Sequence, residues 1–149
     1  MSNICHPLIV GYYRAYEDSR NIYFLLEFLQ GIEMFESIRE IGILNKVISR
    51  YYFGSLLVAV EYLHSQNIIY RDVKPENSIV NYQGKVYLID LGTAKILKSD
   101  NGFRTDTIIG TPHYMAPEVM QGKGYSFEAD IWSLGILFYE LICGHLPFA

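Results

Sequence analysis

The sequence contains only two cysteines, Cys5 and Cys143, which lie far apart and in apolar surroundings. This number and spacing fit neither a disulfide framework nor a cysteine metal site. We therefore expect two reduced, structural thiols and a cytoplasmic protein. The chain also has no charged-then-apolar leader, so we expect no secretory signal peptide.

Positive charge and long apolar runs are scarce as well. Lys and Arg number 12 against 16 Asp and Glu, which gives a formal net charge of −4. Proteins that bind nucleic acids through the phosphate backbone need a basic face, so we expect no nucleic-acid partner. The most apolar stretch, residues 131–143, is about 13 residues long and contains Glu140. It is too short to span a membrane and predicts a buried helix.

Apolar and aromatic residues, by contrast, are plentiful. Among the 149 residues, 50% are hydrophobic and 15% are aromatic. This composition argues against disorder, and the length suffices for one domain with a substantial core.

The first half of the chain alternates between strand-like and helix-like patterns. Residues 8–16 and 21–29 are rich in β-branched and aromatic residues and predict an antiparallel strand pair. Residues 33–42 suit a short helix closed by a glycine. Residues 46–64 predict a long amphipathic helix, because apolar residues recur there at steps of three and four. Its predicted apolar face consists of Val47, Ile48, Tyr51, Tyr52, Leu56, Val60 and Leu63.

The second half predicts a hairpin, a long loop and two helices. Residues 78–80 and 85–90 flank the turn sequence "NYQG" and predict a small hairpin. Residues 91–111 show little periodicity, and a loop of this length is usually functional or disordered. Pro117 is expected to open a short helix and Asp130 the last one. The predicted buried face of the last helix consists of Ile131, Leu134, Gly135, Phe138, Leu141 and Ile142.

The octet "YRDVKPEN", residues 70–77, concentrates charge in the loop after the long helix. A solvated turn and an active site are both possible explanations. Downstream follow "DLG" (90–92), "GTPHYMAPE" (110–118) and "DIWSLG" (130–135). In this order the motifs resemble the catalytic loop, magnesium-binding turn and activation-segment anchor of the eukaryotic protein kinases.

The resemblance covers essentially the whole chain and implies an α+β, protein-kinase-like fold. Residues 1–29 would be the end of the N-lobe and the hinge, and residues 30–149 the mostly helical C-lobe through its long central helix. The family's glycine-rich loop, its strand lysine and the glutamate partner of that lysine would lie before Met1. We therefore expect a partial domain, truncated at both ends, that is not active as the 149-residue chain alone.

The charged loop contains the groups that phosphoryl transfer needs, with ATP and Mg²⁺ as the implied cofactors. A carboxylate must orient the substrate hydroxyl, and Asp72 is the candidate. Lys74 would provide a cation near the transferring phosphoryl group. Asn77 and Asp90 offer the hard oxygen ligands that magnesium prefers. A lone Asp or Lys in a loop is usually a solvated charge, but the constellation favours a functional role for all four.

The segment "LLEFLQG" resembles the hinge of the family, which binds adenine. The ATP-binding residues implied by this match are Leu26, Glu27, Leu29 and Ile79. The alternative is that they are ordinary apolar or strand-end residues, as in any core.

The long loop contains candidate phosphorylation sites. By resemblance, Thr107 matches the regulatory phosphosite, with Thr105 as the alternative. A phosphate there would carry a charge of about −1.5 to −2. Arg71 and Lys95 are the candidate cations to receive it.

Further roles are implied by resemblance alone. Structural roles fall to Thr111, Glu118 and Asp130, of which the last would brace the backbone of the catalytic loop. Glu33, Glu76 and Glu140 match acidic positions that meet arginines of the substrate. For Glu33 the alternative is an ordinary first-turn helix residue, which the helix dipole favours.

Lys74 and Thr111 favour the Ser/Thr branch of the family over the tyrosine branch. Tyr70, where most members have His, points to the cyclic-nucleotide-dependent (AGC-type) group, and the motifs are most similar to its cGMP-dependent branch. The implied partners are protein substrates with basic residues near the target Ser/Thr, and a regulatory domain outside this chain. The alternatives are a non-catalytic kinase-like binding module and a structural fragment without an independent fold. The intact metal-ligand positions argue against a module that has lost catalysis.

Overall fold

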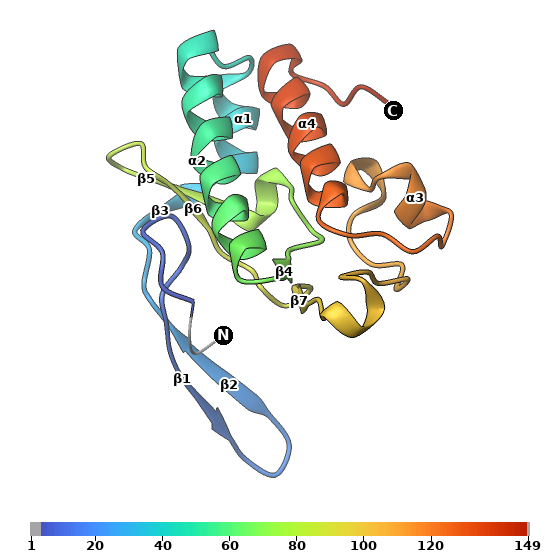
Figure 1. The fold of residues 1–149 in the computed structure, drawn as a ribbon. Helices are drawn as coiled ribbons and strands as arrows, with labels where there is room; N and C mark the ends of the chain where they lie inside the picture. The colour runs from blue at the N-terminus through green and yellow to red at the C-terminus, as the bar shows by residue number, and fades with distance from the viewer. Residues whose placement is uncertain (1–3, 149) are drawn as a thin grey trace.

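A computed structural model describes residues 4–148 of the chain. Along the chain the elements are β1 (Tyr12–Glu17), β2 (Ile22–Leu26), β3 (Gly31–Glu33), α1 (Met34–Ile41), α2 (Lys46–Ser65), β4 (Ile68–Ile69), the 3-10 turn η1 (Pro75–Asn77), β5 (Ser78–Asn81), β6 (Val86–Leu88), β7 (Lys95–Ile96), η2 (Ser99–Asn101), η3 (Pro112–Tyr114), α3 (Pro117–Met120) and α4 (Glu128–Cys143). The predicted α+β class is confirmed. Figure 1 shows α1, α2 and α4 together in one helical body, from which the β1–β2 hairpin projects.

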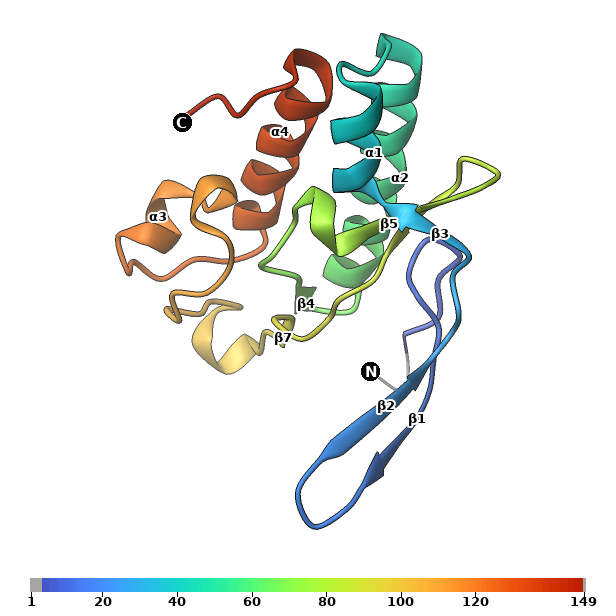
Figure 2. The same cartoon turned by 180° about the vertical axis from the view of Figure 1, so that it is seen from behind.

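Strands β1 and β2 form the predicted antiparallel pair, although both are shorter than the apolar runs suggested. Backbone hydrogen bonds join the segment before β1 to β6: Val10 N–H donates to Leu88 O (2.9 Å), and Leu88 N–H donates to Leu8 O (2.8 Å). Seen from behind in Figure 2, the hairpin again extends away from the helices. It is therefore attached to the body at one end only.

Strands β3, β5 and β6 form a second, antiparallel sheet in that order. The predicted hairpin is its β5–β6 pair, in which Val80 faces Val86. β3 approaches β5 so closely that a Cβ atom on Gly31 would lie 2.3 Å from the carbonyl oxygen of Val80. Only glycine fits this position without moving one of the two strands.

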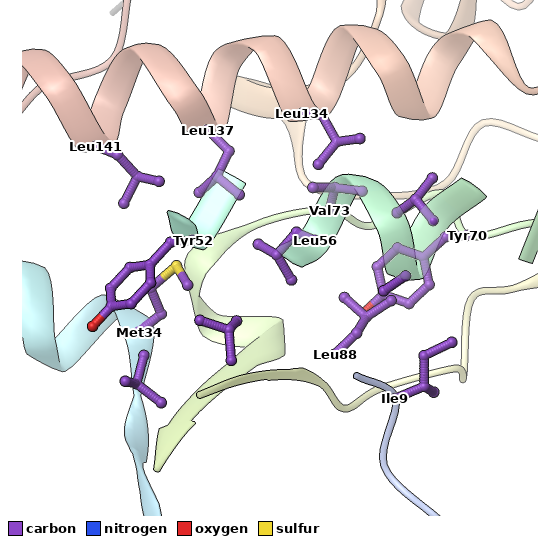
Figure 3. Close-up of a cluster of buried hydrophobic side chains, with 14 of the residues drawn as sticks. Ile9, Met34, Tyr52, Leu56, Tyr70, Val73, Leu88, Leu134, Leu137 and Leu141 are labelled. Carbon is purple, nitrogen blue, oxygen red and sulfur yellow. The ribbon is translucent and has the colours of Figure 1, made fainter. Parts of the chain in front are cut away.

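The main core lies between α2, α4 and the β3–β5–β6 sheet. α2 begins at Asn45, whose side chain accepts hydrogen bonds from two backbone N–H groups at the helix start, both at 3.0 Å. Figure 3 shows the α4 side chains Leu134, Leu137 and Leu141 directed into a buried cluster that contains Leu56 and Tyr52 on α2. Tyr70 and Val73 of the charged loop are buried in the same cluster, which anchors the loop to the core.

The predicted buried faces of both long helices were partly wrong. On α2, Val47 is 76% exposed and Tyr51 is 51% exposed, and Ile48 is also exposed. On α4, Ile131 is 51% exposed and Gly135 is exposed, and the helix begins two residues before Asp130. Apolar residues that recur at helical spacing show that one face of the helix is apolar. That face is buried only if another element packs against it.

The aperiodic stretch 91–111 is organised by contacts that are distant in sequence. Strand β7 pairs with β4, and Thr105 exchanges backbone hydrogen bonds with Tyr125 (2.9 and 2.8 Å). Leu97 and Tyr125 belong to a second, smaller core with Ile69 and Val119. Within residues 4–148, no helix is long and apolar enough to cross a bilayer.

The close approach of β3 to β5 yields a stability prediction. Gly31→Ala should lower the free energy of unfolding by about 1–3 kcal/mol, because the new methyl group overlaps the Val80 carbonyl. Gly54→Ala is the matched control, since a Cβ there meets nothing within 4 Å and lies inside α2. The control should be neutral or stabilising by up to about 1 kcal/mol. Urea denaturation monitored by circular dichroism measures both, and equal stabilities of the two variants would contradict the packing described here.

Candidate active site

The buried carboxylate of Asp130, at the start of α4, binds the backbone of the charged loop. Its Oδ2 accepts a hydrogen bond from Tyr70 N–H and its Oδ1 accepts one from Arg71 N–H, both at 2.8 Å. Nε2 of His64, at the end of α2, lies 2.7 Å from the same Oδ2. One side chain with no solvent exposure thus connects two helices and the loop.

The backbone at Arg71 adopts a left-handed conformation, with φ of 74°. Such a conformation costs a non-glycine residue roughly 1–2 kcal/mol. The hydrogen bond from Arg71 N–H to the Asp130 carboxylate is charge-assisted and offsets this cost. Gly110 passes so close that a Cβ on it would lie 2.5 Å from Arg71 O, and its φ of 120° also requires glycine.

The carboxylate of Asp72 lies at the centre of a cluster of donors. Thr111 Oγ1 donates to its Oδ1 at 2.7 Å, and Asn77 Nδ2 donates to its Oδ2 at 2.8 Å. Lys74 Nζ lies 3.0 Å from the same Oδ2 and donates to Thr111 Oγ1 at 2.9 Å. Burial raises the pKa of Asp72, but the hydrogen bonds from these three side chains outweigh it and lower the pKa below its ordinary value. Asp72 is therefore ionised at neutral pH.

Asn77 and Asp90 lie just outside the small sheet, Asn77 in η1 directly before β5 and Asp90 two residues after β6, and β5 pairs with β6. The Asn77 side-chain nitrogen also donates to the backbone oxygen of Asp72 (2.8 Å), so its amide oxygen is the atom left for other ligands. Ile89 N–H donates to Asn77 O at 3.0 Å, which places Asp90 directly after a residue bonded to Asn77. Asp90 is exposed, and its Oδ1 accepts from Gly92 N–H at 2.7 Å.

An amide oxygen and a carboxylate suit magnesium, which completes its shell with waters and substrate phosphates. A site of three or more His, Cys, Asp or Glu side chains does not occur among the residues described. The donor set therefore fits a magnesium ion that is bound partly by the protein and partly by the phosphates of a nucleotide. It does not suit a metal ion that is bound by protein ligands alone.

The hinge-like segment joins β2 to β3. Glu27 N–H donates to Gly11 O (2.7 Å), and its Oε2 accepts from Gly11 N–H (3.1 Å). Leu26 is 37% exposed, whereas Leu29 and, on β5, Ile79 are half-buried. A hollow of about 240 Å³ lies along this segment and is lined by residues 27–30 and 81–83 and by Tyr87. Of the four predicted ATP-binding residues, Glu27 and Leu29 line this hollow, and Leu26 and Ile79 do not.

The two candidate phosphorylation sites differ in environment. Thr105 is buried, and its hydroxyl accepts a hydrogen bond from Lys95 Nζ at 2.9 Å. Thr107 is exposed, and among the described residues only its backbone oxygen accepts a hydrogen bond, from Tyr125 Oη at 2.6 Å. The Nη1 atom of Arg71 is buried without a hydrogen-bond partner among the described residues.

Of the four glutamates that the sequence singled out, Glu76 and Glu140 lie near each other, and Glu33 and Glu118 lie elsewhere. Glu140 Oε2 accepts from Tyr114 Oη at 2.6 Å. Burial raises the pKa of Glu140; the Tyr114 hydrogen bond lowers it, the charge of Glu76 raises it, and the net pKa is above the ordinary value. Glu76 Oε2 is buried without a hydrogen-bond partner within the described part of the chain. Glu33 is exposed at the start of α1, and Glu118 is half-buried on α3.

Sequence reasoning did not anticipate the contacts of His64 and Tyr114. His64 lies 66 residues before Asp130, and Tyr114 lies 26 residues before Glu140. Neither spacing is a local pattern, so a single sequence contains no signal that pairs them.

The role of Asp130 can be tested through stability. Asp130→Ala leaves the Tyr70 and Arg71 N–H groups unpaired, and should lower the free energy of unfolding by roughly 3 kcal/mol. Asp100→Ala, at an exposed aspartate of η2, is the control and should change it by less than about 0.5 kcal/mol. Chemical denaturation compares the two variants. A loss for Asp130→Ala no greater than that of the control would rule out this anchoring role.

A sequence profile described as the protein kinase domain matches residues 1–149. The chain is 48% identical to the cGMP-dependent protein kinase of Plasmodium berghei over 143 residues, which are 96% of this chain and 16% of that protein. It is 43% identical to human cGMP-dependent protein kinase 2 over 149 residues, or 100% of this chain and 19% of the relative. The cAMP-dependent protein kinase catalytic subunit of Dictyostelium discoideum is 40% identical over 148 residues, covering 99% and 22%. The chain thus spans about a sixth of the length of the Plasmodium protein.

Proposed function

This chain belongs to the protein kinase family, and on that premise we propose that it forms the catalytic core of an ATP-dependent protein serine/threonine kinase. The observation that supports this most strongly is the ionised Asp72, oriented by Thr111, Asn77 and Lys74. A carboxylate held in this way is preorganised to bind a hydroxyl group.

In the proposed mechanism Asp72 accepts a hydrogen bond from the substrate hydroxyl, orients its oxygen for attack and takes up the proton that the hydroxyl loses. Lys74 lies beside Asp72 and contributes positive charge where the phosphoryl group is transferred. Thr111 bonds both side chains and so fixes their distance. When bound, ATP would supply the phosphoryl group and Mg²⁺ would neutralise part of its charge.

The cofactors would be held by residues on both sides of Asp72. Asn77 and Asp90 are the proposed magnesium ligands, through an amide oxygen and a carboxylate oxygen. The backbone of Glu27 and Leu29 would bond the adenine edge. Leu26 beside it and Ile79 below would form the apolar part of the nucleotide site.

Phosphorylation of Thr107 is the proposed regulatory event. Its exposure favours it over the buried Thr105, whose hydroxyl is already bonded to Lys95. Arg71 has a buried nitrogen without a partner among residues 4–148, which suits a phosphate oxygen. Lys95 would be the second receiving cation.

The proposed substrates are proteins with basic residues near the target Ser/Thr. The charge of Glu76 raises the pKa of Glu140, and Glu76 has a carboxylate oxygen that is buried and unpaired among the described residues. An arginine of the substrate would satisfy this oxygen. Glu33 would add a third, exposed charge.

Asp72→Asn tests the proposed activity. The asparagine keeps the shape of the side chain but cannot accept the hydroxyl proton, so kcat should fall about 10²–10⁴-fold with little change in the KM for ATP. Transfer of labelled phosphate from ATP to an arginine-containing serine peptide, by the full-length protein, is the measurement. Asp100→Asn serves as the surface control. Unchanged kcat would contradict the role, and magnesium-dependent ATP binding without any transfer by the natural protein would favour a non-catalytic binding module.

The raised pKa of Glu140 predicts a pH dependence of substrate choice. As the pH falls through this pKa, Glu140 takes up a proton and loses its charge, while Asp72, with its lowered pKa, stays ionised. The KM for an arginine-containing peptide should therefore rise as the pH falls, and that for the peptide with alanine in place of arginine should not. Glu140→Gln should flatten the difference. Parallel pH profiles for both peptides in the natural protein would count against the acidic subsite.

A further inference from the structure

Thr93, three residues after Asp90, joins the segment that follows Asp90 to the catalytic loop. Its hydroxyl donates to the backbone oxygen of Tyr70 at 3.0 Å. Its own backbone oxygen accepts a hydrogen bond from Arg71 Nε at 2.6 Å. Thr93 is half-buried, so both bonds form at the edge of the core.

The position of Asp90 depends on such anchors, because its carboxylate bonds within its own turn. Oδ1 accepts from Gly92 N–H at 2.7 Å, which orients the side chain relative to the turn but not relative to Asn77. On the N-terminal side the turn is tied to the loop by Ile89 N–H and Asn77 O (3.0 Å). On the C-terminal side the first polar connection to residues 70–77 is that of Thr93.

The chemistry of this connection requires a hydroxyl group. Tyr70 has no exposed surface, so its carbonyl oxygen has little access to water as a substitute partner. Valine has the shape of threonine but cannot donate, and would leave that oxygen without the bond. Serine can donate but lacks the methyl group.

From these contacts we infer that Thr93 is a positioning residue, which fixes the Asp90 turn at the place where Asp90 and Asn77 can share one magnesium ion. The inference rests on the proposed function, since it assigns Thr93 a role toward that ion. Thr93 acts through the backbone of the turn and of Tyr70, and touches neither metal nor substrate.

The test is the magnesium dependence of ADP binding to the full-length protein, measured by titration calorimetry at a series of Mg²⁺ concentrations. Thr93→Val should raise the half-saturating Mg²⁺ concentration about threefold to tenfold, which corresponds to the loss of one neutral hydrogen bond. Thr93→Ser should restore it to within about twofold of the natural protein. Ser65→Ala, which removes a hydroxyl bonded to the backbone oxygen of Tyr62 at the end of α2, is the matched control and should have no effect.

Amide hydrogen exchange provides a second readout, independent of nucleotide. Thr93→Val should accelerate exchange in the peptide covering residues 89–95, and Ser65→Ala should not. Equal Mg²⁺ dependence of Thr93→Val and the natural protein would overturn the inference, as would a serine variant as weak as the valine variant. If neither Thr93→Val nor Thr93→Ala folds, the role is one of stability and the inference is likewise overturned. Absence of magnesium-dependent ADP binding in the natural protein would instead refute the proposed function itself.

Discussion

The whole site depends on one buried carboxylate. Asp130 accepts hydrogen bonds from two successive N–H groups of the charged loop and lies 2.7 Å from His64 Nε2. Because these bonds hold Arg71 in a left-handed conformation, the chain turns sharply before Asp72. The aspartate is thereby presented to Thr111 and Asn77, which come from a later loop and from η1. A buried charge is expensive to hold unless it is fully bonded, and here it is bonded to the backbone that it shapes.

Two carboxyl groups of the site have opposite pKa shifts for reasons that the contacts make clear. Asp72 is surrounded by donors, which lower its pKa in spite of burial. Glu140 accepts a single hydrogen bond and lies near the charge of Glu76, so burial prevails and its pKa is raised. Two carboxyl groups are thus suited to different tasks. Asp72 stays ionised beside a hydroxyl, whereas the ionised form of Glu140 is favoured when a cation is bound.

The helices, the two hairpins and the site motifs could be predicted from the sequence because their signals are local, whereas the short strands β3, β4 and β7 were not predicted. Turn residues, apolar periods and the order of "RDVKPEN", "DLG" and "GTPHYMAPE" all lie within short windows. The failures concern partners that are distant in sequence. Val47 and Ile131 belong to apolar stripes but are exposed, since burial depends on what packs opposite. Likewise the order within residues 91–111 comes from pairing with β4 and Tyr125, which no period within the loop reveals.

We propose that Asp130 and the small sheet bring Asn77 and Asp90 together as one metal–nucleotide site next to Asp72. Paramagnetic relaxation by Mn²⁺, used in place of Mg²⁺ with ADP bound to the full-length protein, tests this most directly. We expect the strongest broadening of NMR signals at the Asn77 side-chain amide, Asp90 and Asp72, because Asn77 bonds Asp72 and Asp90 directly follows a residue bonded to Asn77. Broadening should be weakest at Cys143, at the far end of α4, roughly 20 Å along the helix from Asp130. Broadening centred elsewhere, or equal in the presence and absence of ADP, would contradict the account.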